Sequence, residues 1–295
     1  MKKYFICALL TLFSNFVFSQ SKTQVTLSVP QIFEKSEESY AALQTYLDSG
    51  KVIKEFYNND RPSKSSIKFR TAYSEFLGFN FEYYVPNKSN SLYTINKSSN
   101  VVRSWWGIRN QIETQASLSS ALAAATGVSS STSNIIPRLL LPAELKQANV
   151  FKNVKGKITG SEVIDDHVCY VIEGNKSESG IIKLWISKKD FMIRKIFIDR
   201  KIDVKASGTK IDSLIKNQIV TLKSKSNAEQ DAVKRASLVK KLKTLEDANQ
   251  LMTQMQKRSQ SSALSVKTTY YYYPYFPKKL SKNLFTFRPN REVAL

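Results

Sequence analysis

The sequence predicts an α+β fold in which an antiparallel β-sheet carries a helical lid and a long helical insertion. Three observations predict this fold class. Most of the chain alternates apolar and polar residues in segments separated by short turns, which is the pattern of antiparallel strands. A run without any charged residue, Thr114 to Pro137, interrupts this alternation. A later stretch, Ile211 to Ser262, contains no Pro or Gly and is rich in Ala, Lys, Leu and Gln, a composition that favours helix.

The first expected element is an N-terminal helix. From Phe33 to Phe56 apolar residues recur near the helical period, and we expect Gly50 to separate this helix from the first strand. The strands expected after it are 65–73, 79–85, 92–96, 101–107, 156–163, 167–173, 181–187, 191–203, 264–275 and 284–287. Because the turns between them are short, a meander is the simplest topology.

The uncharged run lies within an expected lid, residues 113–149. Its first half, Ser117 to Ala125, favours helix because Ala and Leu lose little side-chain entropy there. Its second half leads into an apolar cluster bracketed by Pro137 and Pro142: Ile135, Ile136, Leu139, Leu140 and Leu141. The run contains seven serines, so it is too polar for a membrane span, which needs about 20 predominantly apolar residues. We therefore expect it to cover an apolar part of the protein, or to be covered by one.

The first residues predict export. A positive start, an apolar stretch and a small residue at position 19 indicate a cleaved signal peptide, 1–19. We expect the remainder, 20–295, to form a single domain with no lipid anchor, because Cys7 lies near the start of the apolar stretch rather than at its end. Removal of Cys7 leaves Cys169 as the only cysteine, so an internal disulfide is excluded.

The net charge is strongly positive, +21 for the whole chain. For an exported protein the expected anionic partners are lipid headgroups, lipopolysaccharide and polyanionic glycans rather than nucleic acid. Residues 205–258 hold twelve Lys or Arg against five acids, and this helical insertion, 205–263, is the candidate membrane or partner surface. Its proposed contact residues are Lys234, Arg235, Lys240, Lys241 and Lys243. The alternative is a solvated lysine-rich surface, which is the commoner meaning of scattered lysines.

No catalytic constellation is predicted. His167 and Cys169 share one face of a strand, but nothing in the sequence indicates an environment that would activate the thiol. One His and one Cys cannot supply the three or four ligands that zinc usually takes, and no cofactor-binding motif is found.

Aromatic residues give the expected sheet large apolar faces. Such a sheet either fills its own interior or holds a lipid chain, and the uncharged lid favours the second interpretation although plain core is the commoner role of any single aromatic. The residues expected to line an acyl-chain cavity are Phe79, Phe81, Tyr83, Trp105, Leu139, Leu140 and Trp185.

The order of elements resembles that of the periplasmic lipoprotein carriers of the LolA and LolB type and their uncharacterised lipoprotein-sorting relatives. The resemblance rests on the strand FNFEYY (79–84), on GSEVIDDHVCYVIEG (160–174) and on LWISKKDFMIRKI (184–196). It implies a strongly curved antiparallel sheet, an incomplete barrel, whose apolar concave face receives acyl chains beneath helices. It also implies a periplasmic location. The insertion is longer than a minimal carrier needs, and no residue here is matched to the functional arginine of the carriers.

Three hypotheses follow. The first is a non-enzymatic periplasmic carrier or chaperone, expected to be monomeric, that binds acyl chains of a lipoprotein or lipid. The second is an envelope scaffold acting through the basic helical insertion. The third, a hydrolase using Cys169, is remote.

Overall fold

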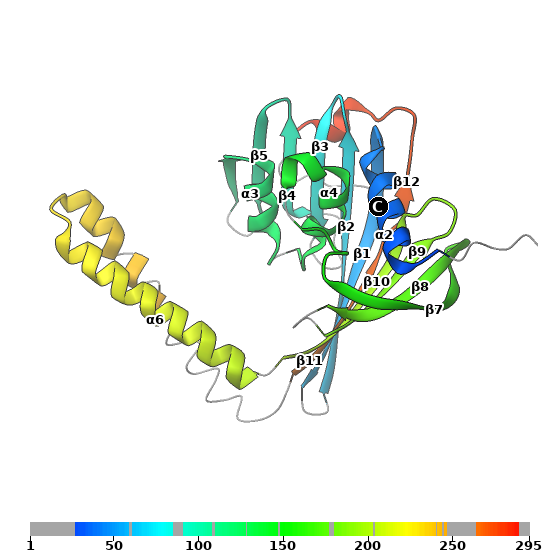
Figure 1. The fold of residues 1–295 in the computed structure, drawn as a ribbon. Coiled ribbons are helices and arrows are strands. Elements are labelled where there is room, and N and C mark those ends of the chain that lie inside the picture. The colour runs from blue at the N-terminus through cyan, green and yellow to red at the C-terminus, as the bar shows by residue number, and fades with distance from the viewer. Residues whose placement is uncertain are drawn as a thin grey trace, which may run out of the picture.

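Figure 1 shows the computed structural model, which describes residues 27–58, 61–84, 91–107, 110–127, 129–146, 148–176, 180–202, 204–239, 241–243, 245–246 and 264–288. The expected signal peptide, 1–19, and Lys240 lie outside these residues. The strands are β1 Thr45–Asn58, β2 Arg61–Ser74, β3 Gly78–Tyr84, β4 Ser91–Ser98, β5 Val101–Trp106, β6 Gln111–Gln115, β7 Val154–Ile164, β8 His167–Lys176, β9 Ile181–Ser187, β10 Ile193–Ile202, β11 Leu264–Tyr271 and β12 Pro274–Tyr275.

The strands form one antiparallel sheet in the order β6-β5-β4-β3-β2-β1-β11-β10-β9-β8-β7, and β12 pairs with β1 beyond the end of β11. The two ends of this path, β6 and β7, do not pair with each other, so the sheet is an open, incomplete barrel. Neighbours along the path pair antiparallel from the 14-residue β1 and β2 outward. The predicted fold class is confirmed.

The helices are α2 Val29–Ala41, α3 Leu118–Ala125, α4 Thr132–Leu140, α5 Pro142–Leu145 and α6 Val204–Ala228, with a 3₁₀ helix, η2, at Lys282–Phe285. At the start of α2 the backbone N–H of Ser28 donates to Gln31 Oε1 at 2.9 Å. The first turn of α3 is capped by Ser117, whose Oγ accepts from the Ser120 N–H at 3.1 Å. Both contacts satisfy polar groups that a helix start leaves without an intrahelical partner.

Helices α2, α3 and α4 cover one face of the sheet, which we call the concave face (Figure 1). A single core cluster joins their apolar side chains to residues of β3, β4, β9 and β10. On α3 and α4 the residues buried in this cluster are Leu118, Ala121, Leu122, Ala125, Ile135, Ile136, Leu139 and Leu140. The uncharged run therefore covers an apolar sheet face.

The strand β1 forms where the sequence pattern predicts helix. The prediction of helix up to Phe56 is wrong, because the closely spaced apolar residues of this segment belong to a central strand. Gly50 lies within this strand and pairs with Phe69 in β2. A Cβ at Gly50 would lie 2.1 Å from the Phe69 ring, so the glycine makes room for the ring instead of ending a helix. Strand β6 is absent from the predicted elements, and residues 284–287 are not a strand: they start within η2.

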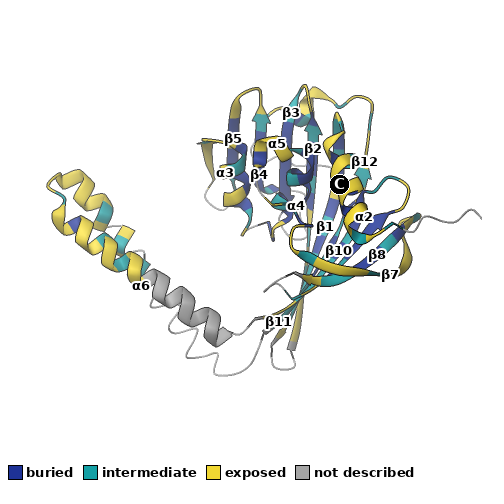
Figure 2. Ribbon diagram, in the orientation of Figure 1, coloured by how far each residue is buried: buried dark blue, intermediate teal, exposed yellow. Residues whose placement is uncertain are grey.

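The predicted helical insertion is present between β10 and β11. It begins at Val204 rather than near Ile211, and a further helical segment follows α6 at 232–239. Figure 1 shows α6 extending away from the sheet, and Figure 2 shows that the described residues at its outer end are mainly exposed. An ion pair of 2.9 Å between Lys223 Nζ and Glu246 Oε1 joins α6 to the later helical residues.

Candidate functional site

Five of the seven residues expected to line an acyl-chain cavity meet in the core cluster beneath the lid: Phe79, Phe81, Tyr83, Leu139 and Leu140. The three aromatics occupy every second position of β3 and face the concave side of the sheet. The two leucines of α4 pack against this side. All five are almost completely buried. They form a filled core beneath the lid helices in this structure.

The two tryptophans of that set lie on the other face of the sheet. Trp185 packs in a separate cluster with Cys169 and Val171, and its Nε1–H donates to Glu162 Oε2 at 2.7 Å. The reason is strand alternation, because Leu184 and Ile186 on either side of it point into the main core.

Trp105 follows the same rule. Trp105 pairs with Thr94, and the next pair along the two strands is Ile95 with Ser104. Ile95 lies in the core cluster beneath α3, so the neighbouring pair of Trp105 and Thr94 faces the other side of the sheet. Trp105 and Trp185 are therefore not candidates for the concave cavity.

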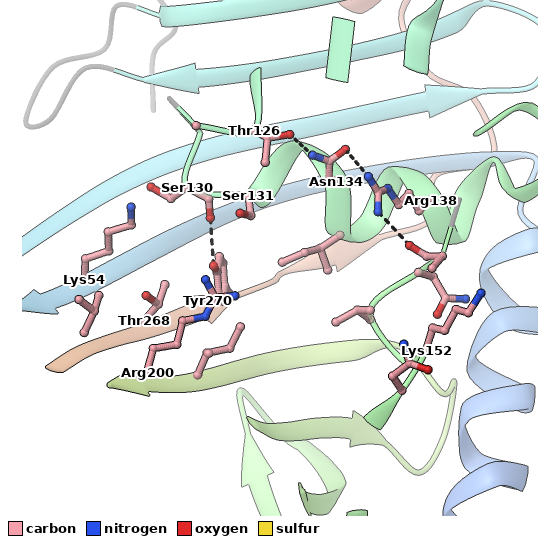
Figure 3. Close-up of a pocket in the computed structure, with 18 of the residues that line it drawn as sticks. Lys54, Thr126, Ser130, Ser131, Asn134, Arg138, Lys152, Arg200, Thr268 and Tyr270 are labelled. Carbon is pink, nitrogen blue, oxygen red and sulfur yellow. Dashed lines mark hydrogen bonds between the residues drawn. The ribbon is translucent and has the colours of Figure 1, made fainter. Parts of the chain in front are cut away.

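A cleft of about 700 Å³ opens between the lid and the concave face. As Figure 3 shows, three parts of the chain line it: the lid from Thr126 to Arg138, the segment 148–153 that follows α5, and strands β1, β10 and β11. Its apolar lining consists of Phe56, Ile135, Ala148, Val150, Ile198 and Val266. None of the seven residues predicted from the sequence is part of this lining.

Four cationic side chains line the cleft, and none of its described lining residues is acidic; the cations are Lys54, Arg138, Lys152 and Arg200. Burial lowers the pKa of Lys54 from its ordinary value, and the neighbouring charge of Arg200 lowers it further. Burial also lowers the pKa of Arg138. The cleft thus combines apolar walls with a positive potential.

The cations differ in how far the protein already engages them. Arg138 donates to Asn134 Oδ1 at 3.3 Å within α4 and to the carbonyl oxygen of Ala148 at 2.9 Å, and the second bond joins α4 to the segment after α5 (Figure 3). In the described part of the chain no hydrogen bond or ion pair engages the side chain of Lys54 or of Arg200. Among the described residues, therefore, none competes with a ligand for these two side chains.

The turn between α3 and α4 is bound to the sheet through Ser130. The Tyr270 hydroxyl donates to the Ser130 carbonyl at 3.0 Å, and the Tyr83 hydroxyl shares a hydrogen bond of 3.1 Å with Ser130 Oγ. Burial raises the pKa of Tyr270 to about 12, so its hydroxyl keeps its proton near neutral pH and remains a donor. Ser130 and Ser131 adopt positive φ angles of 58° and 69°, a conformation uncommon outside glycine.

The other serines of the lid satisfy one another and the helix ends. Ser129 Oγ donates to Ser133 Oγ at 3.0 Å, and Ser133 Oγ in turn donates to the carbonyl of Leu122 at 3.2 Å. The Thr132 hydroxyl donates to the Ser129 carbonyl at 2.7 Å. These contacts explain how a serine-rich segment is buried without charged residues, since buried polar groups need hydrogen-bond partners.

The residues predicted for a membrane or partner surface lie on the insertion. The described ones, Lys234, Arg235, Lys241 and Lys243, are exposed. Arg235 Nε donates to the carbonyl of Glu229 at 2.7 Å, and Lys234 Nζ lies 4.0 Å from Asp231. None of the helices in the described part of the chain combines the length and apolar composition that a membrane crossing needs.

Cys169 is completely buried, and its thiol donates to the backbone carbonyl of His167 at 3.3 Å. Burial raises the pKa of Cys169 to about 11, which keeps the thiol protonated near neutral pH and therefore weakly nucleophilic. Among the described residues no group of three or more His, Cys, Asp or Glu side chains is placed to hold a metal ion.

Sequence reasoning missed the cationic residues that line the cleft. Lys54 and Arg200 occupy inward positions of strands whose other inward residues include Val52 and Ile196. In a strand whose residues alternate between the two faces, the position of a cation indicates which face it lies on. This signal could not be used for Lys54, because the sequence pattern predicts a helix for its segment.

No family model matches the chain, and no curated protein matches it. Among solved structures, a LolA superfamily protein from Nitrosomonas europaea is similar to it, with 16% identity, a TM-score of 0.24, and coverage of 60% of this chain and 79% of that one. A DUF1329 family protein from Desulfovibrio piger has 7% identity and a TM-score of 0.28, covering 88% and 98%. A putative outer membrane lipoprotein-sorting protein domain from Vibrio parahaemolyticus has 8% identity and a TM-score of 0.25, covering 58% and 76%. At these identities and TM-scores, the likeness assigns no function to this chain.

Proposed function

We propose that this protein is a non-enzymatic carrier or chaperone that holds an acyl chain of a lipoprotein or lipid between its lid helices and the concave face of its sheet. The observation that carries this proposal is the cleft of about 700 Å³ under the turn between α3 and α4, with its apolar lining. An acyl chain needs no polar chemistry to bind, because each buried CH₂ contributes about 0.8 kcal/mol.

The lid supplies a route from the cleft to the core. Lifting α3 and α4 extends the apolar surface from Ile135 and Ile198 in the cleft to Phe79, Phe81 and Leu140 beneath the lid. Our proposed acyl contacts are therefore the cleft lining together with the core set Phe79, Phe81, Tyr83, Leu139 and Leu140. The polar tie at Ser130 is the contact that opening must break.

A cleft-filling variant tests this proposal. Val266 lines the cleft, and the preceding residue of the same strand, Ser265, points to the opposite face. We expect Val266→Trp to lose a co-purifying lipid or acylated peptide, detected by mass spectrometry of an organic extract, and Ser265→Trp to retain it. A wild-type extract free of any acyl compound, together with no binding of an added fatty-acid probe, would contradict the proposal.

The location and oligomeric state belong to the same proposal. A carrier of this kind would act in the periplasm after removal of residues 1–19, as a monomer, with exposed basic residues of the insertion touching an anionic membrane surface. Fractionation of the producing cells, with N-terminal sequencing of the protein recovered, tests the location.

A second candidate function is an envelope scaffold that binds a partner through the insertion. The observation that favours it is the exposure of valines on this helical segment, with Val220 at 66% and Val233 at 81%. Val233 precedes Lys234 and Arg235 in the chain, and an exposed valine next to two cations suits a partner that offers an apolar groove with an acidic rim.

Deleting the insertion separates the two candidates. Ile202 and Leu264 are directly paired at the ends of β10 and β11, so a two-residue Asn-Gly turn in place of 203–263 can close the hairpin. A carrier keeps its bound acyl compound in this variant. A scaffold loses its partner, which a pull-down from the producing cells measures against the full chain.

A further inference from the structure

The strand register brings two cations to the same part of the concave face. Lys54 of β1 pairs with Thr268 of β11, and Arg200 of β10 pairs with Val266 of the same strand. Lys54 and Arg200 thus flank β11 from opposite sides, and their partners on β11 are two residues apart. Figure 3 shows both side chains in the cleft near Thr268 and Tyr270.

This arrangement is electrostatically unfavourable in the free protein. Two positively charged side chains face the same cleft, and neither has a hydrogen bond or ion pair among the described residues. None of the described lining residues of the cleft is acidic. Partial burial of Lys54 makes the repulsion harder to screen. The lowered pKa of Lys54, caused first by burial and then by Arg200, is the expected consequence. An anion between the two side chains removes the repulsion.

We infer that Lys54 and Arg200 form a binding site for a phosphate-type headgroup. The class of ligand follows from the charges: two cations match a dianionic phosphomonoester better than a single carboxylate, and guanidinium binds phosphate through paired hydrogen bonds. The Thr268 hydroxyl is a third polar group beside them (Figure 3). Resting on the proposed function, the inference makes the cargo a phosphorylated amphiphile whose chain lies along the apolar lining.

The test compares three probes by titration calorimetry below micelle-forming concentrations: dodecyl phosphate, the neutral dodecyl glycerol ether and inorganic phosphate. The wild-type protein is expected to bind dodecyl phosphate about tenfold or more tightly than the ether, since hydrogen bonds to charged groups are the strong ones. The double variant Lys54→Gln with Arg200→Gln is expected to bind dodecyl phosphate and the ether equally, with the affinity that the wild type has for the ether. Lys54→Arg is expected to keep the preference, because it keeps the charge.

The matched control is Lys51→Gln with Lys201→Gln. It removes the same charge from the same two strands, but at positions that alternate to the opposite face. It should keep the wild-type preference for dodecyl phosphate. If the control loses as much preference as the cleft variant, or if the wild type does not distinguish the phosphate from the ether, the site is refuted.

The probes also separate this inference from the proposed function. If inorganic phosphate binds in a manner that depends on Lys54 and Arg200 while the ether does not bind, the anion site stands as a site for a free oxyanion and the acyl-carrier proposal fails. If the ether binds and phosphate adds nothing, the carrier proposal stands and the headgroup site fails. Equal unfolding midpoints of the variants establish that folding is not the cause.

Discussion

The hydroxyl of Tyr270 donates a hydrogen bond of 3.0 Å to the backbone carbonyl of Ser130. Tyr270 belongs to β11, and the second tyrosine bound to the same serine, Tyr83, belongs to β3. Strands β2 and β1 lie between them in the sheet. One serine in the lid turn therefore bridges two strands that do not pair with each other, and it does so beside the cleft.

Tyr270→Phe is expected to loosen the lid turn without disturbing the sheet. The Ser130 carbonyl would lose its buried donor, a loss that costs about 1 to 3 kcal/mol, while the phenyl ring still fills the same space. Hydrogen–deuterium exchange should show faster exchange of the amides of 129–133, and urea unfolding should show the lower stability.

The control for this change is Tyr271→Phe, on the same strand but on the opposite face, where the ring lies 4.8 Å from Lys51 Nζ. Exchange in the lid turn should match that of the wild type in this control. Unchanged exchange at 129–133 in Tyr270→Phe would show that the hydroxyl does not hold the lid.

The lid could be predicted from sequence because its signal is local. The absence of charge from Thr114 to Pro137, the helix-forming residues after Ser117 and the apolar cluster near Leu139 all lie within one segment. The structure packs the apolar side chains of its helices against the sheet. The strands β2 and β3 were also predictable, because apolar and polar residues alternate along both of them.

The central strand and the cleft could not be predicted, because both depend on contacts distant in sequence. The space that Gly50 provides has meaning only opposite Phe69, and without that partner a glycine resembles the end of a helix. Lys54 and Arg200 likewise approach each other only through β11, which lies beyond the insertion. The side of the sheet that Trp185 faces depends on strand register, which a shift of one residue reverses.

Gly50→Ala is expected to destabilise the protein by about 1 to 3 kcal/mol, the usual cost of overpacking a core. The added Cβ would lie 2.1 Å from the Phe69 ring, and that ring is itself packed 5.6 Å from the ring of Tyr272. The measurement is the free energy of unfolding in urea.

A double-mutant cycle identifies the cause. In a Phe69→Leu background the ring is absent, so adding the Gly50→Ala change should cost clearly less than it does in the wild type. Equal costs in both backgrounds would mean that the conformation of Gly50, and not the contact with Phe69, limits substitution.

Trp185→Phe is expected to leave acyl binding unchanged and to lower stability. The substitution removes the hydrogen bond that the indole donates to Glu162. It also weakens the contact with Lys195, whose Nζ lies 4.2 Å from the centroid of the indole ring. Together these contribute about 1 to 2 kcal/mol. The affinity for a fatty-acid probe and the unfolding midpoint are measured on the same sample. Acyl binding as weak in this variant as in Val266→Trp would return Trp185 to the cavity and contradict the assigned faces.

Asp48 provides a prediction about pH. Its carboxyl group is completely buried in β1, Oδ1 accepts from the Tyr273 N–H at 2.8 Å, and Oδ2 has no partner in the described residues. Burial raises the pKa of Asp48 to about 7, although the Tyr273 hydrogen bond and the charge of Arg194 partly oppose the shift. An unfolded Asp titrates near about 3.9, so between these values the folded protein holds a proton that the unfolded chain has released.

The free energy of unfolding should therefore fall as pH rises from about 4 to 7, by a contribution on the order of 4 kcal/mol at most, and this contribution should level off above pH 7. Other carboxylates with lowered pKa values, such as Glu55, act in the opposite direction, so the comparison is with Asp48→Asn. Asparagine does not titrate, and its side-chain oxygen can still accept from Tyr273. The free energy of unfolding of both proteins is measured in urea at several pH values. The wild-type value should fall relative to that of Asp48→Asn as pH rises toward 7. A difference that stays constant from pH 4 to 8 would mean that Asp48 is ionised in the folded protein throughout this range.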